Sequence, residues 1–219
     1  TSLNNLINSQ VHIERFRLLE EDIPNANPGY LKIDHNHIDN SADLENISFK
    51  YFESNLFIFE DINIQIPKNK HTVITGPNGS GKSTLLGLIA GILIPETGSI
   101  KLSSDKFGYV GVTPLIISGS LRENLTYGNK NELEDAEIYD MIHEFKLFNE
   151  NENISLDHQV TNKSLSSGQM QKVSFIRALL SDLEILLLDE STSNLDANTR
   201  ELIFGILNKE IILIIFAKF

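Results

Sequence analysis

The chain has 219 residues, 41% of them hydrophobic, which is enough to bury a sizeable core in one or two domains. Lys and Arg together number 18 against 30 Asp and Glu, and the resulting net charge of −12 argues against nucleic acid as a partner. Cysteine is absent, which excludes disulfides and thiolate metal sites, and the longest aliphatic runs, such as residues 210–216, are too short to span a bilayer.

The first 44 residues differ from the rest in their sequence pattern. Residues 11–20 carry apolar side chains at helical spacing, and Pro and Gly residues between 24 and 29 end that pattern. His35 and His37 leave two interpretations open, a metal-binding pair or a polar connector, and the connector is favoured because no further His or Cys lies nearby. The chain begins with Thr rather than Met, so we expect it to be a piece of a longer protein.

Strand patterns begin after this connector. Two short alternating segments, residues 47–51 and 62–66, predict strands of an antiparallel β-layer. Residues 71–75 form a β-branched run that predicts another strand, and an apolar helix is expected over residues 83–90. The loop between this strand and this helix reads Gly-Pro-Asn-Gly-Ser-Gly-Lys-Ser-Thr over residues 76–84.

This loop fits the phosphate-binding pattern G-x-x-x-x-G-K-[ST], with Gly76, Gly81, Lys82 and Ser83 in register. Glycine permits backbone conformations in which successive N–H groups point at a phosphate, and the helix that follows adds its positive end. Lys82 supplies a mobile charge for the β- and γ-phosphates, and Ser83 supplies a hydroxyl ligand for Mg²⁺. With a strand before it and a helix after it, the loop predicts a nucleoside triphosphate site.

A second nucleotide motif follows about a hundred residues later. Strands are expected near residues 99–102 and 107–110, and residues 131–158 are helical in pattern and acidic, as a solvated face would be. Residues 185–190, Ile-Leu-Leu-Leu-Asp-Glu, predict a strand buried in a parallel sheet with carboxylates at its carboxyl end. Asp189 is then placed to hold the Mg²⁺ shell, and Glu190 to orient or deprotonate an attacking water.

Between these motifs, residues 165–169 read Leu-Ser-Ser-Gly-Gln, and here the chain resembles the ATP-binding cassette (ABC) family, whose signature is usually L-S-G-G-Q. Ser167 stands where the family has its first Gly. Residues 193–196, Ser-Asn-Leu-Asp, look like the family's D-loop, which ends here on Asp196. The order of phosphate loop, signature, Asp-Glu strand and D-loop holds over residues 45–219.

The resemblance implies an α/β fold: a P-loop NTPase core with a mostly parallel sheet, an antiparallel β subdomain and an α-helical signature subdomain. We accordingly expect a connector helix and linker over residues 1–44, leading from a preceding membrane domain. An ATP-binding domain is expected over residues 45–219, with its helical subdomain at about 113–170 and its C-terminus truncated.

The resemblance also implies how the site is assembled. ATP and Mg²⁺ are the expected cofactors, and two cassettes are expected to face each other head to tail, so that the signature of one caps the γ-phosphate bound by the other. The residues implied to contact ATP within one chain are Tyr51, Gly76, Asn78, Gly79, Ser80, Gly81, Lys82, Ser83 and Thr84. Glu190 and Lys82 are implied in catalysis, and Ser83 and Asp189 in Mg²⁺ binding. The residues implied to act on the partner's nucleotide are Ser166, Ser167, Gly168 and Gln169. Tyr51 matches the aromatic that stacks on adenine, with an ordinary strand aromatic as the alternative.

Two further stretches resemble the exporter branch of the family. Residues 119–128 look like the exporter sequence beside the coupling loop, and the helix expected at residues 11–20 suits the segment after a last membrane helix. The favoured parent is therefore a membrane exporter with its transmembrane domain in the same chain. This soluble part is expected at the cytoplasmic face of the membrane, partnered by a second ATP-binding domain in a homodimer or a heterodimer.

At two positions the chain departs from the family pattern. The glutamine that begins the coupling loop falls on Val112, and the histidine after the final strand falls on Ala217. Two hypotheses follow: an ATPase that powers export, which Lys82, Asp189 and Glu190 favour, or a degenerate, slowly hydrolysing switch subunit of an asymmetric pair, which Val112 and Ala217 favour. A soluble cassette protein of DNA repair or translation is a third possibility, which the acidic charge and the exporter-like stretch disfavour.

Overall fold

The structure, a computed structural model, describes residues 29–35, 39–68, 70–129, 132–149, 155–181, 183–192, 195–207 and 213–218. The helix expected at residues 11–20, His37, and the first two residues of the expected D-loop lie outside the described residues. None of the helices in the described part of the chain combines the length and the apolarity that a bilayer span needs.

Strands and helices are interspersed along the chain, which confirms the α/β class. The strands are β1 (Leu31–Ile33), β2 (Asn40–Phe49), β3 (Phe59–Pro67), β4 (Thr72–Thr75), β5 (Thr97–Leu102), β6 (Phe107–Val110), β7 (Gly119–Ser120), β8 (Gln159–Val160), β9 (Ile185–Asp189) and β10 (Leu213–Lys218). The helices are α2 (Lys82–Ile89), α3 (Leu121–Thr126), α4 (Asp135–Glu144), α5 (Ser167–Leu179) and α6 (Ala197–Leu207).

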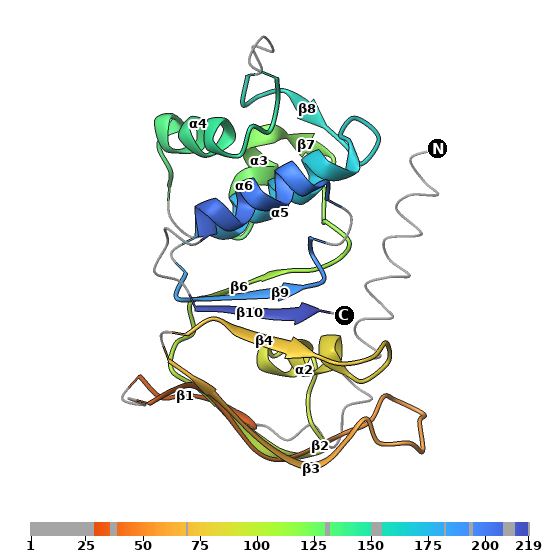
Figure 1. Cartoon of the computed structure of the whole chain (residues 1–219). Helices are drawn as coiled ribbons and strands as arrows, with labels where there is room; N and C mark the ends of the chain where they lie inside the picture. The colour runs from red at the N-terminus through yellow and green to blue at the C-terminus, as the bar shows by residue number, and fades with distance from the viewer. Residues whose placement is uncertain are drawn as a thin grey trace, which may run out of the picture.

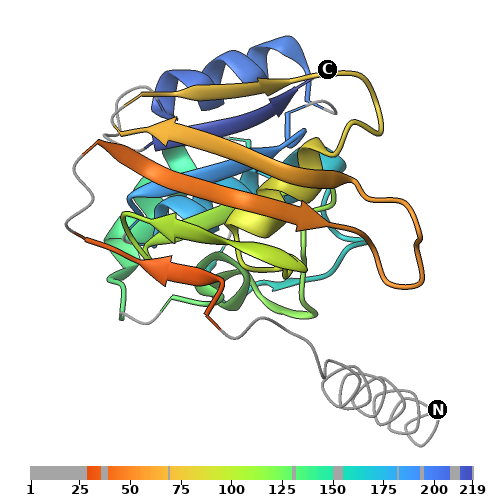
Figure 2. The same ribbon diagram turned by 90° about the horizontal axis from the view of Figure 1, so that it is seen from below.

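One sheet has the strand order β1-β5-β2-β3 and lies in the foreground of Figure 2. β2 pairs antiparallel with both β3 and β5, whereas β1 pairs parallel with β5. The strands expected at residues 47–51 and 62–66 correspond to β2 and β3, but β2 begins at Asn40, inside the segment expected as a connector. The polar residues Ser41 and Asp43 near its start are buried nonetheless, and Asn40 Nδ2 donates to Asp43 Oδ1 at 2.8 Å.

The other large sheet has the order β4-β10-β9-β6 and is parallel throughout. β9 lies inside this sheet, and all five of its residues are buried, as its aliphatic run predicts. Because side chains alternate along a strand, Ile185 and Leu187 join one hydrophobic core while Leu186 and Leu188 join a second core on the opposite face. β9 therefore separates the two cores of the molecule.

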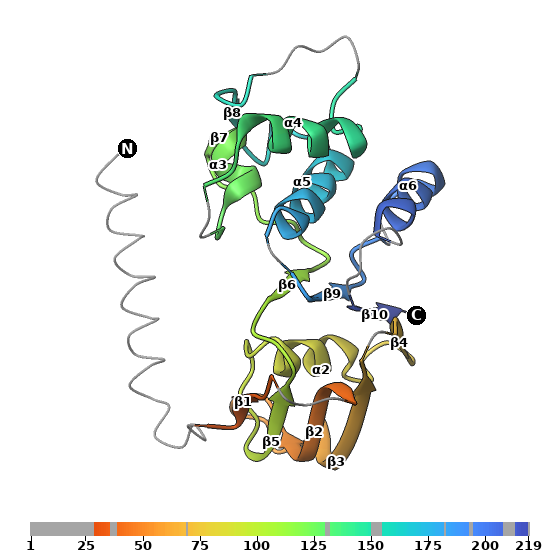
Figure 3. The same ribbon diagram turned by 90° about the vertical axis from the view of Figure 1, so that its left-hand side faces the viewer.

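The layers follow from these two cores. Helix α2 lies between the two sheets, and α5 and α6 cover the far face of the parallel sheet (Figures 1 and 3). Helices α3 and α4 and the short β7-β8 pair stand beyond α5. The helical part expected at about 113–170 thus contains α3 and α4, while α5 continues to Leu179.

Arg177 ties α5 to the segment that precedes and forms α3. Its Nε donates to the carbonyl of Asn124 at 2.7 Å, and its terminal nitrogen donates to the carbonyl of Leu115 at 2.9 Å. The guanidinium also lies 5.6 Å from the centre of the Tyr127 ring. One side chain of α5 therefore holds three points of the segment 115–127.

The stability of the helical layer should depend on Phe145, which follows α4. Its side chain is fully buried and stacks on Phe175 of α5 with ring centroids 6.5 Å apart. We expect Phe145→Ala to lower the free energy of unfolding by about 3–5 kcal/mol, because truncation leaves a cavity that the core cannot fill. Urea denaturation followed by circular dichroism measures this change. Phe52→Ala is the control, because Phe52 is 82% exposed, and a loss near zero for both variants would contradict the packing described.

Candidate functional site

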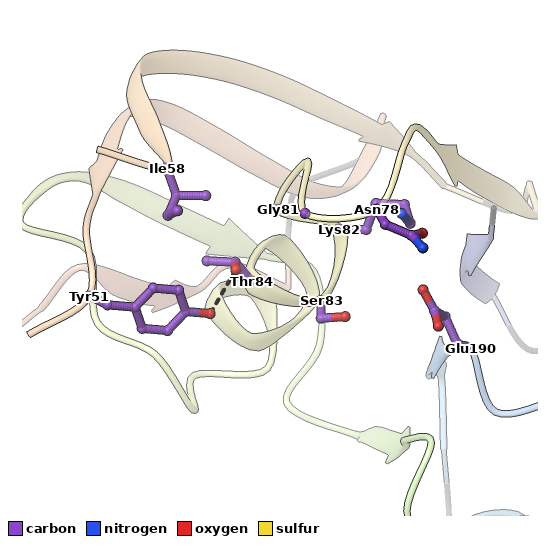
Figure 4. A pocket seen from close by; sticks show the side chains of 9 residues that line it. Tyr51, Ile58, Asn78, Gly81, Lys82, Ser83, Thr84 and Glu190 are labelled. Carbon is purple, nitrogen blue, oxygen red and sulfur yellow. Dashed lines mark hydrogen bonds between the residues drawn. The ribbon is translucent and has the colours of Figure 1, made fainter. Parts of the chain in front are cut away.

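The loop after β4 opens on a pocket of about 520 Å³, and most of the residues predicted to contact ATP within one chain line it. The lining comes from the β2–β3 connection, from the loop and first turn of α2, and from the residue after β9. Its members are Tyr51, Ile58, Asn78, Gly79, Gly81, Lys82, Ser83, Thr84 and Glu190 (Figure 4). Segments more than a hundred residues apart in the sequence thus line one pocket.

The loop takes its shape from a turn and two glycines. The amide of Ser80 donates to the carbonyl of Pro77 at 3.2 Å, and Gly79 and Gly81 have positive φ values of 78° and 91°. A Cβ on Gly81 would lie 2.8 Å from both Ile58 Cγ2 and Phe59 Cζ, so only glycine fits there. Gly81 is also the N-cap of α2 and offers no capping side chain, so the first amides of the helix can bind an anion.

Lys82 places its cation at the centre of this loop. Its Nζ donates to the carbonyls of Gly76 and Pro77 at 3.0 and 3.1 Å, and the residue is 7% exposed. A cation held against a loop of amides attracts phosphate, and its three donors can be redirected from the carbonyls to phosphate oxygens. Gly76 and Ser80 belong to the loop but do not line the pocket.

Asp189, at the end of β9, connects to the loop through Ser83. Ser83 Oγ donates to Asp189 Oδ1 at 2.8 Å, and Tyr109 Oη donates to Asp189 Oδ2 at 2.8 Å. Burial, and then the hydrogen bond to Asp189, raise the pKa of Tyr109, so the phenol keeps its proton and acts as the donor. The facing oxygens of Ser83 and Asp189 are the hard donors that Mg²⁺ prefers, so these residues fit that cation.

Glu190 follows Asp189 and lies at the end of the pocket opposite Tyr51 (Figure 4). Its φ of 49° is left-handed, which is uncommon for a residue other than glycine and turns the chain sharply as β9 ends. Figure 4 shows its carboxylate pointing towards the side of the pocket that carries Ser83 and Asn78. A carboxylate in this position can act on a water that approaches a bound phosphate.

Tyr51 closes the end of the pocket opposite Glu190 (Figure 4). Its hydroxyl and Thr84 Oγ1 share a hydrogen bond of 2.8 Å, and the ring meets Phe49 edge to face with centroids 5.1 Å apart. The ring is 48% exposed, so it is fixed at its edges while part of its surface stays open. Stacking on a base stays a prediction.

The signature residues do not line this pocket. They lie at the start of α5, across the parallel sheet from α2 (Figure 3). Ser166 caps that helix: its Oγ accepts from the amide of Gln169 at 3.2 Å, and Gln169 Oε1 accepts from the amide of Ser166 at 2.9 Å. Ser166 and Ser167 are exposed, and a Cβ on Gly168 would meet nothing within 4 Å.

Asp196 of the expected D-loop accepts hydrogen bonds within its own chain. Its carboxylate accepts from the hydroxyl and the amide of Thr199 at 2.7 and 2.9 Å, next to the start of α6. The side-chain bond first, and then the backbone bond, lower the pKa of Asp196. A role towards a second chain stays a prediction.

The two positions that depart from the family pattern, Val112 and Ala217, both lie in the described part of the chain. Val112 lies just after β6 and is 42% exposed. Ala217 is in β10, paired with Asp189 on one side and with Ile74 on the other. In the register of the sheet, position 217 is therefore level with the end of β9.

Two contributions to this site have no clear signal in the sequence. Ile58 lines the pocket from the β2–β3 connection, and Tyr109 binds Asp189 from a neighbouring strand. The capping pair of Ser166 and Gln169 had a readable signal, because Ser and Gln three residues apart form a capping box. In the part of the chain that the structure describes, no group of three or more His, Cys, Asp or Glu residues is placed to hold a metal.

The family model described as ABC transporter matches residues 59–193, more than half of the chain. ABC transporter B family member 14 of Arabidopsis thaliana is 36% identical, over 89% of this chain and 17% of the relative. ATP-dependent permease MDL1 of Candida albicans is 34% identical, over 68% of this chain and 24% of the relative.

A solved structure of a bacterial Atm1-family ABC exporter with ATP bound has the same fold, with a TM-score of 0.77 and 23% identity. It covers 94% of this chain, which spans 39% of that one. Of the two curated relatives, the chain spans only 17% and 24% of the length. The family match, together with a glycine loop, a buried lysine and a carboxylate around one pocket, shows that this chain belongs to the ABC transporter family.

Proposed function

We propose that this chain is the ATP-binding domain of an ABC exporter, in which ATP joins two such domains and hydrolysis separates them. The observation that carries the proposal is the pocket in which Lys82, Ser83 and Glu190 come together from separate elements. Its parts match the tasks of phosphoryl transfer: a loop of amides and a cation for the phosphates, and a carboxylate for the attacking water. When bound, Mg²⁺ would lie at Ser83 and Asp189 and would neutralise developing phosphate charge.

The start of α5 supports the second half of the proposal, capture of a partner's nucleotide. Ser166 Oγ accepts one hydrogen bond from Gln169 and still has its own proton to donate. The amides of Ser167 and Gly168 belong to the first turn of a 13-residue helix, where backbone donors have no partner within the helix. Exposed donors at a helix N-terminus favour an anion, and a γ-phosphate on a second copy is such an anion.

The finer assignments belong to the same proposal. Lys82, with Gly76, Asn78, Gly79, Ser80, Gly81 and Thr84, would hold the triphosphate, and Tyr51 would stack on the base. The partners would be a second ATP-binding domain and a transmembrane domain at the cytoplasmic face of a membrane. Turnover would be slow, because Val112 and Ala217 stand where the family pattern places a glutamine and a histidine.

Nucleotide binding should depend on the close packing around Gly81. Gly81→Ala forces a Cβ against Ile58 and Phe59 and should weaken ATP binding by about tenfold or more, which corresponds to about 1.4 kcal/mol. Gly128→Ala is the matched control, because Gly128 also has a positive φ, of 83°, but open space around its Cβ. Both variants carry the strain of a left-handed alanine, about 1–2 kcal/mol, in thermal melting. A fluorescent ATP analogue measures binding, and equal affinities in the two variants would contradict the argument.

ATP should also bring two chains together. We expect Glu190→Gln with Mg-ATP to form a dimer detectable by light scattering, because bound nucleotide would persist and seal the interface. Lys82→Ala in the same background should stay monomeric, since it lacks the cation for the phosphates. Dimers that form equally well without ATP would contradict the shared site.

A matched glycine pair tests the role of α5 in this dimer. Gly168→Ala and Gly205→Ala each add a methyl group to a helix where nothing lies within 4 Å, so both variants should fold. Only Gly168→Ala should abolish the ATP-dependent dimer, because its methyl group would stand where a partner's phosphate approaches. Equal dimerisation of the two variants would remove α5 from the interface.

Hydrolysis should be slow but real. We expect phosphate release from Mg-ATP below about 1 s⁻¹, the low end of ordinary enzyme rates, and none in Glu190→Gln. The double change Val112→Gln and Ala217→His should raise the rate by about 10²-fold, the effect of one preorganised donor. A rate that does not respond to the double change would show that these two positions are wrongly assigned, whereas fast release by the unaltered chain would contradict slow turnover alone.

A further inference from the structure

The carboxylate of Asp189 is held at both of its oxygens. Ser83 binds Oδ1 and Tyr109 binds Oδ2, each at 2.8 Å, and Asp189 is only 5% exposed. The two donors come from different elements, because Ser83 is in the first turn of α2 while Tyr109 is in β6. Rotation about the last side-chain bond of an aspartate is otherwise soft, so two fixed donors determine which way each oxygen points.

The strand register makes the contact with Tyr109 possible. β6 runs parallel to β9, and Tyr109 pairs with Leu187, two residues before Asp189. The long phenol side chain therefore reaches forward along the sheet to the carboxylate. Gly111 leaves room for the ring, since a Cβ there would lie 3.1 Å from Tyr109 Cε1. Gln171 Nε2 donates to the carbonyl of Gly111 at 3.2 Å and ties that turn to α5.

Three residues after Tyr109, in the turn that follows β6, the chain carries an apolar side chain. Val112 can neither donate a hydrogen bond nor coordinate a metal, and it is 42% exposed. The polar group that β6 and its following turn present to Asp189 is therefore the phenol.

We propose that Tyr109 is a positioning residue for Asp189, and that its hydroxyl supplies the polar contact that Val112 cannot make. The inference rests on the proposed function, because it concerns how the chain prepares its carboxylate for a Mg²⁺–nucleotide complex. Ser83 would offer its oxygen to the cation, and Tyr109 would keep the carboxylate oriented while Ser83 does so. Tyr109 itself would touch neither nucleotide nor cation.

The test separates Mg²⁺ binding from nucleotide binding in the full 219-residue chain. A fluorescent ATP analogue is titrated with the chain in EDTA, and Mg²⁺ is then titrated into the complex. In Tyr109→Phe, the Mg²⁺ concentration at half-saturation should rise by about tenfold, the effect of losing a hydrogen-bond partner of a metal ligand. Affinity for the analogue in EDTA should change by less than about twofold, because Tyr109 does not line the nucleotide pocket.

Two further variants complete the design. Tyr127→Phe removes a hydroxyl from a tyrosine whose ring packs on Arg177 instead, so its Mg²⁺ requirement should match that of the unaltered chain. Val112→Gln in the Tyr109→Phe background should bring the Mg²⁺ requirement back to within about threefold of the unaltered value, whereas Val112→Gln alone should shift it by less than that.

The outcomes distinguish failure of the role assigned to Tyr109 from failure of the proposed function. An unchanged or lower Mg²⁺ requirement in Tyr109→Phe, or an equal loss of affinity in EDTA and in Mg²⁺, would overturn the inference and leave ATP binding intact. If Tyr109→Phe does not fold, Val112→Gln alone still decides, because a tenfold gain in Mg²⁺ affinity would show that Tyr109 does not supply the contact. Failure of the unaltered chain to bind the analogue would instead overturn the proposed function.

Discussion

Two segments that lie 106 residues apart in the sequence meet at the hydrogen bond that Ser83 Oγ donates to Asp189 Oδ1. Helix α2 and β9 also share a hydrophobic core, but this bond joins their polar ends, and a site for a phosphate–metal pair needs both. Because an ionised acceptor strengthens a hydrogen bond to about 1.5–3 kcal/mol, this contact also stabilises the fold near the pocket. Tyr109 secures the same carboxylate from β6, so α2 and β6 both hold one side chain of β9.

The parallel sheet makes this convergence possible. Strand β9 is buried on both faces, and its alternate residues belong to two different cores. One core contains α2 and the first sheet, and the other contains α5 and the rest of the helical layer. The end of β9 is therefore fixed by packing from both sides, which suits a position that must hold Asp189 and turn sharply at Glu190. Neither core alone would determine the direction of these two carboxylates.

Much of this arrangement could be predicted from the sequence, because its signals are local. The aliphatic run before Asp189 predicts a buried strand, and the glycine pattern from Gly76 to Ser83 predicts a strand, a loop and a helix; the structure has these elements at those residues. The start of β2 could not be predicted, since its polar residues are buried by partners on β3 and β5 that no local pattern reveals.

The bond between Tyr109 and Asp189 is hidden for a related reason. It depends on the register of two strands that are far apart in the chain, and register is set by packing rather than by either strand alone. Ile58 is likewise brought to the pocket by a connection whose course the sequence does not determine. Contacts across the sheet are thus the part of the site that requires the structure.

The three contacts of Arg177 have a mechanical consequence. Ten residues of continuous helix separate Ser167 from Arg177, which amounts to about 15 Å of stiff rod. Because Arg177 fixes α5 near its C-terminal end, the exposed N-terminal end cannot tilt unless these contacts break or residues 115–127 move with the helix. A displacement of the N-terminal end of α5 is thus transmitted to residues 115–127, which contact the opposite end of the helix, with no flexible segment in between.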